Sequence, residues 1–362
     1  MEGRVGDPGL EQIITKNRQG SFLSNPLPTK EEHKMKTSRF KILLLTLLAF
    51  SLSIGFSEEL LAKPVKLKAV VFLSKDHPLS VATVEWVKRV NTELKDQIEI
   101  DYAGGAEIIP PYQQNEALKN GVIDINFNAT ANFVSMFPEG WAFFVSKYSP
   151  TEERKKGGFY DLMVNRFQKI NMMYLGRWLY LPFYLWVNRP VTQLTELRGL
   201  KMRTGGAYDR FMKELGIVPV TVPPGDVYTA LERGTVDGFG WPIIGARDLG
   251  WTDKCKNYID HPFNAPSNCI ILMNLNVWNG LSKTVQAKIM EITEKFEPYM
   301  VDHFKKAEAD ERMALEKIGV KRIQFSPEET KKYLDTSIKV SWDMMGEKVP
   351  DLVPELKRAT GN

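Results

Sequence analysis

The sequence predicts an α/β protein with two similar lobes, each a mostly parallel sheet flanked by helices. Three observations carry this prediction. The chain has 362 residues, which is room for about two domains of ordinary size. One octapeptide pattern, Ala-Leu-x-x-Gly-x-x-Asp, occurs at 117–124 and again at 230–237. Around both copies, short apolar segments alternate with helical patterns, which is typical of parallel sheets with right-handed crossovers.

The octapeptide also predicts where a ligand would bind. Each copy has the pattern of a last helical turn, a glycine able to adopt the left-handed cap conformation, and a short apolar strand. Both strands lead into small or polar residues, at 126–128 and 238–241. Because ligands of open α/β sheets bind outside the carboxyl ends of the strands, we expect a cleft between the lobes that holds a small molecule.

The elements of each lobe follow from their apolar spacing, which is two residues in strands and three to four in helices. The first lobe is predicted to have a strand at 65–72, a helix with Val84, Val87 and Leu94 on one side, a strand at 98–102, a helix at about 112–120 and a strand at 122–128. The second lobe is predicted to have a strand at 200–203, a helix with Tyr208, Phe211, Met212 and Leu215 on one side, a strand at 217–222, a helix capped by Asp226 and ending at Gly234, and a strand at 236–239.

Two segments are predicted to join the lobes. The aromatic-rich stretch 172–188 fits a strand that passes from one lobe to the other. Ser282 starts a helical pattern that reaches about Lys317, longer than one lobe needs, with Pro298 as an expected kink. A capping box with a proline at its first helical position, at 326–329, starts another helix. The predicted domains are an N-terminal extension and signal peptide at 1–62, a first lobe at 63–180 plus 269–308, and a second lobe at 181–268 plus 309–362.

The N-terminal segment has the pattern of an export signal. Basic residues precede an uninterrupted apolar stretch at 42–54, which is shorter than the roughly 20 residues of a membrane span. Cleavage is expected after Ser57 or after Ala62, and Met35 is an alternative start to Met1. An uncleaved membrane anchor is the other interpretation. We expect a periplasmic protein that is exported by a cleavable signal peptide.

Composition and motifs argue against several classes of function. The net charge of +4 is spread without a long basic run, so nucleic acid is not an expected partner. No nucleophile elbow, P-loop or dinucleotide-binding glycine motif is present, and His77, His261 and His303 do not lie in catalytic patterns, so neither enzymatic activity nor a cofactor is expected. Cys255 and Cys269 lie 14 residues apart and could form a disulfide after export, or remain two buried thiols.

Two segments carry a resemblance to a known family. They are Leu-Arg-Gly-Leu-Lys-Met-Arg at 197–203 and a Tyr-x-Ala-Leu-x-x-Gly-x-Val-Asp-Gly pattern at 228–238. Together they resemble the solute-binding proteins of TRAP (tripartite ATP-independent periplasmic) transporters, the DctP-like family, over nearly all of the chain after the signal. The resemblance implies a two-lobed periplasmic-binding-protein-like fold, with lobes joined by crossing strands and a long helix.

The same resemblance implies a function. Such a protein has no catalytic activity; it captures a small organic acid, a carboxylate, in the interlobe cleft and delivers it to the small and large membrane subunits of the permease. A sensor component that presents the same ligand to a receptor is the alternative.

The resemblance also indicates site residues. The family's carboxylate-binding arginine falls on Arg203, whose planar guanidinium matches a carboxylate. Trp241 takes the pocket position after the second octapeptide, with a core role as the alternative. Asn128 is the first-lobe counterpart of the strand end near Trp241, and Phe183 could equally serve in packing. The expected ligand-binding residues are Arg203, Trp241, Asn128, Asn132, Phe72 and Phe183.

One departure from the family bears on the ligand. Members that bind 2-oxo acids through a metal ion have a Glu directly before the pocket Trp and a Gln before the crossing strand. Here those positions are Gly240 and Pro182, which offer no side-chain oxygen, whereas a hard cation needs several oxygen ligands. We therefore expect no bound metal and an aromatic or otherwise apolar carboxylate, given the aromatic residues at 174–186 and Trp241.

Overall fold

The computed structural model describes residues 63–155, 158–264, 266 and 269–362. The expected signal peptide and its two cleavage positions lie outside these residues. Within them, no helix is both long and apolar enough to cross a membrane. The strands are β1 (Val65–Val71), β2 (Ile98–Gly104), β3 (Ile125–Ala129), β4 (Met172–Leu179), β5 (Tyr184–Val187), β6 (Lys201–Thr204), β7 (Val218–Thr221), β8 (Gly238–Trp241), β9 (Asn257–Ile259), β10 (Cys269–Asn274) and β11 (Lys321–Ile323).

The strands form two sheets, and each sheet contains one reversed strand. The first sheet has the order β2-β1-β3-β10-β4 and the second has the order β11-β9-β5-β8-β6-β7. All neighbours in the first sheet are parallel except those of β10, and all in the second are parallel except those of β5. Both reversed strands directly follow a passage of the chain from one sheet to the other. The prediction of mostly parallel sheets is confirmed.

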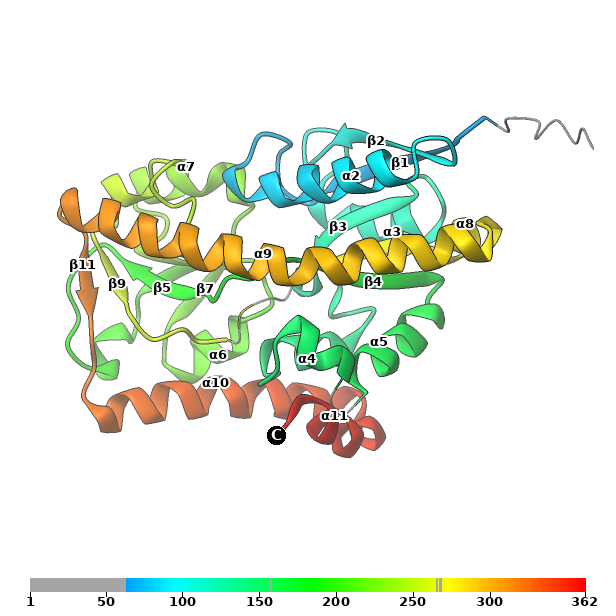
Figure 1. The fold of residues 1–362 in the computed structure, drawn as a ribbon. Helices are drawn as coiled ribbons and strands as arrows, with labels where there is room; N and C mark the ends of the chain where they lie inside the picture. Colours follow the sequence, from blue (N-terminus) through cyan, green and yellow to red (C-terminus); the bar gives the residue numbers. More distant parts are fainter. Residues whose placement is uncertain (1–62, 156–157, 265, 267–268) are drawn as a thin grey trace, which may run out of the picture. The chain divides into compact units, whose positions relative to one another are not determined.

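Helices cover the sheets on both sides (Figure 1). They are α2 (Val81–Glu93), α3 (Gln114–Lys119), α4 (Pro150–Lys155), α5 (Phe159–Gln168), α6 (Asp209–Glu214), α7 (Val227–Glu232), α8 (Leu275–Gly280), α9 (Lys283–Lys317), α10 (Pro327–Lys348) and α11 (Val353–Thr360). The C-terminal helices contact parts of both predicted lobes. Tyr333 of α10 packs against Phe211 of α6, whereas Thr360 of α11 accepts a hydrogen bond from the N–H of Lys147.

Helix α9 is the predicted long helix, and it is attached to both sheets (Figure 1). In its first half, Thr293 accepts a hydrogen bond of 3.0 Å from the indole of Trp86 on α2. In its second half, Glu308 accepts a hydrogen bond of 3.0 Å from the hydroxyl of Tyr184 on β5. Pro298 lies between these two contacts and does not end the helix.

The two octapeptides have the same structure. The glycine of each copy lies in the left-handed region, with φ of 73° and 66°, as predicted for helix caps. The carboxylate of Asp124 accepts a hydrogen bond of 2.7 Å from the N–H of Lys68, and its own N–H donates to the Lys68 carbonyl at 3.0 Å. Asp237 makes the same two bonds with Lys201, at 2.9 and 2.6 Å. Each copy therefore fixes the strand that follows it to a parallel neighbour, β3 to β1 in the first sheet and β8 to β6 in the second.

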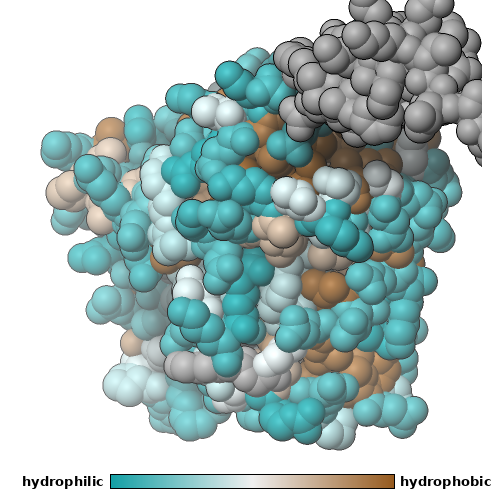
Figure 2. Space-filling model, turned by 45° about the vertical axis from the view of Figure 1, so that its right-hand side comes forward, coloured by the Kyte–Doolittle hydropathy of each residue, from teal (hydrophilic) through white to brown (hydrophobic). Residues whose placement is uncertain are grey.

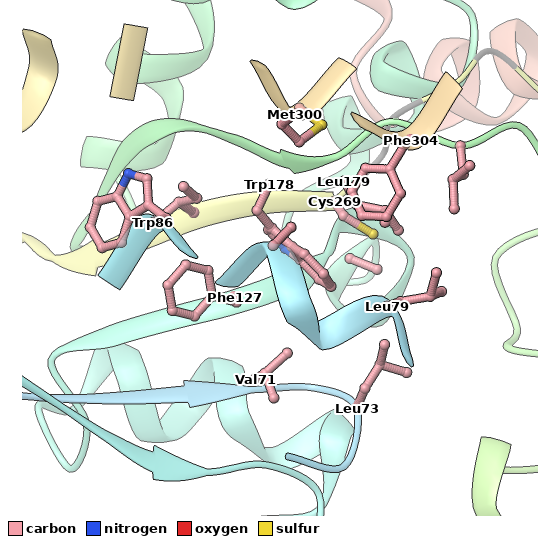
Figure 3. Packing of buried hydrophobic residues seen from close by; sticks show 14 of the residues in the cluster. Val71, Leu73, Leu79, Trp86, Phe127, Trp178, Leu179, Cys269, Met300 and Phe304 are labelled. Carbon is pink, nitrogen blue, oxygen red and sulfur yellow. The ribbon is translucent and has the colours of Figure 1, made fainter. Parts of the chain in front are cut away.

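In the core beside the first sheet, several aromatic rings pack together among aliphatic side chains (Figure 3). Phe127 of β3 meets Trp86 edge to face at 5.6 Å between ring centroids, and it meets Trp178 of β4 at 6.3 Å. Met300 and Phe304 of α9 belong to the same cluster. All five side chains are almost completely buried. Much of the aromatic crowding in the crossing segment therefore serves the core.

Two apolar positions of the first lobe differ from expectation. Val84 is 47% exposed, whereas Val87 and Leu94 are buried as predicted, because α2 directs Trp86 toward the sheet instead. Val122 is 62% exposed, and β3 starts at Ile125, later than predicted. On the face shown in Figure 2, hydrophilic residues cover most of the surface and apolar residues gather in a few places between them.

Two helix caps also differ. The side chain of Asp226 makes no capping hydrogen bond at the start of α7. Ser326 caps α10 by accepting from the N–H of Glu329 at 3.3 Å, as a capping box requires. In a capping box the carboxylate of Glu329 would also accept a hydrogen bond from the N–H of Ser326. Here it accepts instead from the N–H of Leu194 in the second lobe.

Candidate functional site

A cavity lies between the ends of strands that belong to the two sheets. It is lined by the predicted residues Phe72, Asn132, Phe183, Arg203 and Trp241. They come from the carboxyl ends of β1, β3, β6 and β8 and from the residue before the reversed strand β5. The open space is about 50 Å³, and an adjoining cavity of about 270 Å³ shares Phe72 and two prolines with it. Together they lie at the lower end of the usual range of ligand pockets, which begins at about 300 Å³.

Arg203 is the charged group of this cavity. It is 3% exposed, and its Nε donates a hydrogen bond of 2.8 Å to the carbonyl of Val222. Its guanidinium lies 5.3 Å from the ring centroid of Trp241. Among the residues that the structure describes, no carboxylate lies within ion-pair distance of it. The site therefore holds a buried guanidinium that has no carboxylate counterion in the described part of the chain.

The charge of a second buried arginine is balanced by a carboxylate of this protein. Arg177 of β4 is 1% exposed, and its guanidinium contacts both carboxylate oxygens of Glu153. Burial raises the pKa of the Glu153 carboxyl, and the charge of Arg177 opposes that rise. Ser146 further donates to Glu153 at 2.6 Å. Arg203 has no such carboxylate partner among the described residues, and it lines the cavity.

Aromatic side chains form the walls around Arg203. Phe183 meets Trp241 edge to face at 6.1 Å and lies 6.3 Å from the ring of Tyr208. Trp241 is 4% exposed and also packs against Trp251 at 5.1 Å. Trp241 and Phe183 therefore both line the cavity and pack in the core, which combines the two interpretations weighed for them.

A chain of buried amides leads to the cavity from the first sheet. Asn132 lines the cavity and donates to the Oδ1 of Asn128 at 2.7 Å. Asn128 is fully buried, does not line the cavity, and donates to Asn115 and Asn126 at 2.9 and 2.7 Å. Asn128 itself does not reach the cavity in this structure, because its amide is hydrogen-bonded to the other three, and a direct contact with the ligand stays a prediction. Asn128 holds Asn132 in place.

Sequence reasoning did not identify Tyr208 and His77 as site residues. Tyr208 lines the cavity, and its hydroxyl donates to the Gly240 carbonyl at 3.0 Å. A Cβ at Gly240 would lie 2.7 Å from the Tyr208 ring, so the tyrosine occupies the space of a residue-240 side chain. His77 lines the adjoining cavity. The missing side chain at Gly240 was a signal that another residue fills this space.

The two cysteines do not bond to each other. Both are buried, Cys255 after a short 3₁₀ helix and Cys269 at the start of β10, where it lines the cavity. Burial raises the pKa of the Cys255 thiol to about 12 and raises that of Cys269 as well. Of the two alternatives left by the spacing, the structure has the pair of buried thiols.

A larger hollow of about 440 Å³ lies at the far end of the second sheet, beside Tyr258 of β9 and the end of α9. It is lined by Arg312 and Arg322, but both contact the carboxylate of Asp260, at 2.7 and 3.7 Å. Its positive charges are thus compensated within the protein, unlike that of Arg203.

The sequence and fold were compared with known proteins. The family model of bacterial extracellular solute-binding proteins, family 7 (DctP), matches residues 70–348. A monocarboxylate 2-oxoacid-binding periplasmic protein of Nostoc sp. is 28% identical over 166 residues, which span 45% of this chain and only 44% of that relative. The C4-dicarboxylate-binding periplasmic protein DctP of Rhodobacter capsulatus is 20% identical over 247 residues, 66% of this chain and 73% of that protein.

Solved structures of low sequence identity share the fold. A TRAP transporter solute-binding protein from Bordetella bronchiseptica, with copurified calcium and picolinate bound, has a TM-score of 0.71 at 21% identity, covering 83% of this chain and 93% of that one. An extracytoplasmic solute receptor from Bordetella pertussis that binds pyroglutamic acid has a TM-score of 0.73 at 16% identity, covering 82% and 100%. These relatives are substrate-binding proteins rather than enzymes. The chain therefore belongs to the bacterial extracellular solute-binding proteins of family 7, the DctP-like solute-binding proteins of TRAP transporters.

Proposed function

We propose that this protein captures a small organic acid in the cleft between its two sheets and delivers it to the small and large membrane subunits of a TRAP permease. The observation that carries the proposal is Arg203, a buried cation without a carboxylate partner among the described residues. A ligand carboxylate would supply the missing counterion. Because Nε is bonded to Val222, the carboxylate would be held by Nη1 and Nη2.

The walls of the cavity indicate the rest of the ligand. Phe72, Phe183, Trp241 and Tyr208 surround the space next to Arg203. We propose an aromatic or otherwise apolar carboxylate. Picolinate, pyroglutamic acid and orotic acid, which are bound in solved relatives, are cyclic acids and support a carboxylate in general.

We further propose that binding needs no metal ion. A side chain at position 240 would collide with Tyr208, and Pro182 offers no side-chain oxygen. The cavity therefore lacks two of the oxygen ligands that a hard cation would use. Equal affinity before and after treatment with a chelator is the expected result.

The experiment is a thermal-shift screen of the purified protein against several hundred carboxylates, with Arg203→Ala alongside. We expect apolar and aromatic acids to raise the melting temperature of the wild type and to leave that of the variant unchanged. A melting temperature raised only by small hydrophilic acids would contradict the proposed ligand class. N-terminal sequencing of the exported protein would test cleavage after Ser57 or Ala62 and the periplasmic location.

A further inference from the structure

Two buried N–H groups near the cavity have no hydrogen-bond partner among the described residues: Nε2 of His77 and Nε1 of Trp241. The His77 side chain is 6% exposed and that of Trp241 is 4% exposed. The Nδ1 of His77 accepts a hydrogen bond of 3.1 Å from the N–H of Leu79, so the neutral ring carries its proton on Nε2. Burial lowers the pKa of His77 to about 4, which keeps the ring neutral at pH 7. Both groups are therefore donors.

The two donors belong to different sheets and meet beside a glycine. His77 follows β1 of the first sheet, and Trp241 ends β8 of the second. Their rings are edge to face, with centroids 5.9 Å apart. A Cβ at Gly245 would lie 3.5 Å from the Nε1 of Trp241 and 3.6 Å from the Cε1 of His77, with no other atom within 4 Å. The edges of both rings therefore lie next to Gly245, which has no side chain to contact them.

The position of this pair relates it to the carboxylate anchor. Trp241 lines the cavity that contains Arg203, and its ring lies 5.3 Å from the guanidinium of Arg203. His77 lines the adjoining cavity of about 270 Å³. A buried donor without a partner costs free energy unless something accepts from it. Trp241 lies next to both Arg203 and His77.

We propose that His77 and Trp241 form a second polar subsite, which accepts an oxygen substituent of the bound acid through Nε2 and Nε1. This inference rests on the proposed function and adds a substrate class. Because both groups only donate, the subsite takes a hydroxyl, carbonyl or ether oxygen. It disfavours an ammonium group, which has no acceptor to offer. The ligand would thus be a hydroxy, oxo or alkoxy acid rather than an amino acid.

The test compares three acids that differ in one substituent: mandelate (both enantiomers), phenylacetate and phenylglycine. Calorimetric titration of the wild type should show that mandelate binds about tenfold more tightly than phenylacetate, as expected for two neutral hydrogen bonds. Phenylglycine should bind more weakly than phenylacetate. In His77→Phe the preference for mandelate should fall by about threefold or more, whereas phenylacetate should keep its affinity. His77→Gln, which places a donor near the same position, should restore part of the preference.

Equal affinity for mandelate and phenylacetate in the wild type would overturn the inference, because ordered water would then satisfy both donors. An equal loss for both acids in His77→Phe would also overturn it, since His77 would then act by packing alone. Failure of all three acids to bind, or binding that survives Arg203→Ala, would count against the proposed function instead.

Discussion

Replacing Arg203 tests the proposed function most directly. In the proposed complex the two terminal nitrogens of its guanidinium hold the ligand carboxylate, while Nε stays bonded to Val222 at 2.8 Å. Each hydrogen bond to a charged group contributes about 1.5–3 kcal/mol. Loss of two such bonds amounts to at least about 3 kcal/mol, which is about a hundredfold in affinity at about 1.4 kcal/mol per power of ten.

The substitution should weaken binding but have little effect on the stability of the fold. Since Arg203 has no counterion among the described residues, its removal leaves none of their charges unpaired. We therefore expect Arg203→Ala to bind at least about a hundredfold more weakly, while its free energy of unfolding without ligand stays close to that of the wild type. Arg203→Lys should lose about tenfold, because it keeps the charge and loses the planar fork.

The assay is isothermal titration calorimetry with the best acid from the thermal-shift screen, together with urea unfolding of each variant. Arg233→Ala is the matched control, since it makes the same charge change at an exposed position outside the cavity. An Arg203→Ala protein that is folded and binds within about threefold of the wild type would refute the assignment of Arg203 as the carboxylate anchor.

Three other variants probe stability. The pKa of His77 is lowered from 6.5 to about 4 by burial, so below pH 6.5 the unfolded chain takes up a proton that the folded protein does not. The free energy of unfolding should therefore fall by about 3 kcal/mol from this group between pH 7 and pH 4, and urea unfolding of His77→Phe should lack this loss. Glu153→Gln removes the carboxylate that contacts the buried Arg177 and should cost about 3–5 kcal/mol in urea unfolding. Gly240→Ala places a methyl group 2.7 Å from the Tyr208 ring and should cost about 1–3 kcal/mol and lower the melting temperature.

Each of these has a control in the same chain. His303→Phe changes an exposed histidine and should keep the acid-induced loss. Asp335→Asn breaks an exposed ion pair with Lys331 and should cost at most about 0.5 kcal/mol. Gly346→Ala adds a methyl group where nothing lies within 4 Å and should leave stability unchanged or raise it. If the control variants changed stability as much as the test variants, the predicted effects could not be due to the burial of the substituted groups.

Features decided by neighbouring residues could be predicted from the sequence. The glycine caps of the octapeptides, the start of α9 at Ser282 and the two-residue period of β2 depend on local backbone preferences. The rule that ligands of open α/β sheets bind outside the carboxyl ends of the strands then predicted the place of the site. Arg203 and Trp241 both line the cavity, and their contact with a ligand stays a prediction.

Features decided by contacts between distant segments could not be predicted. Asn128 lies at the expected strand end, but whether its amide faces a ligand depends on Asn115, in a separate helix. Tyr208 fills the space at Gly240 from 32 residues away. The spacing of the two cysteines likewise does not fix the distance between their side chains.

The reversed strand β10 has a consequence for folding. It lies between β3 and β4 in the first sheet, yet Cys269 pairs with Ala129, a residue 140 positions earlier. Bringing β3 and β10 together closes a long loop, which costs chain entropy before the strands form hydrogen bonds. Contacts between residues so far apart in the sequence slow folding. A fragment that contains every strand of the first sheet also contains β5 to β9 of the second. The two lobes therefore cannot be separated by a single cut, and the first lobe cannot complete its sheet until most of the chain is present.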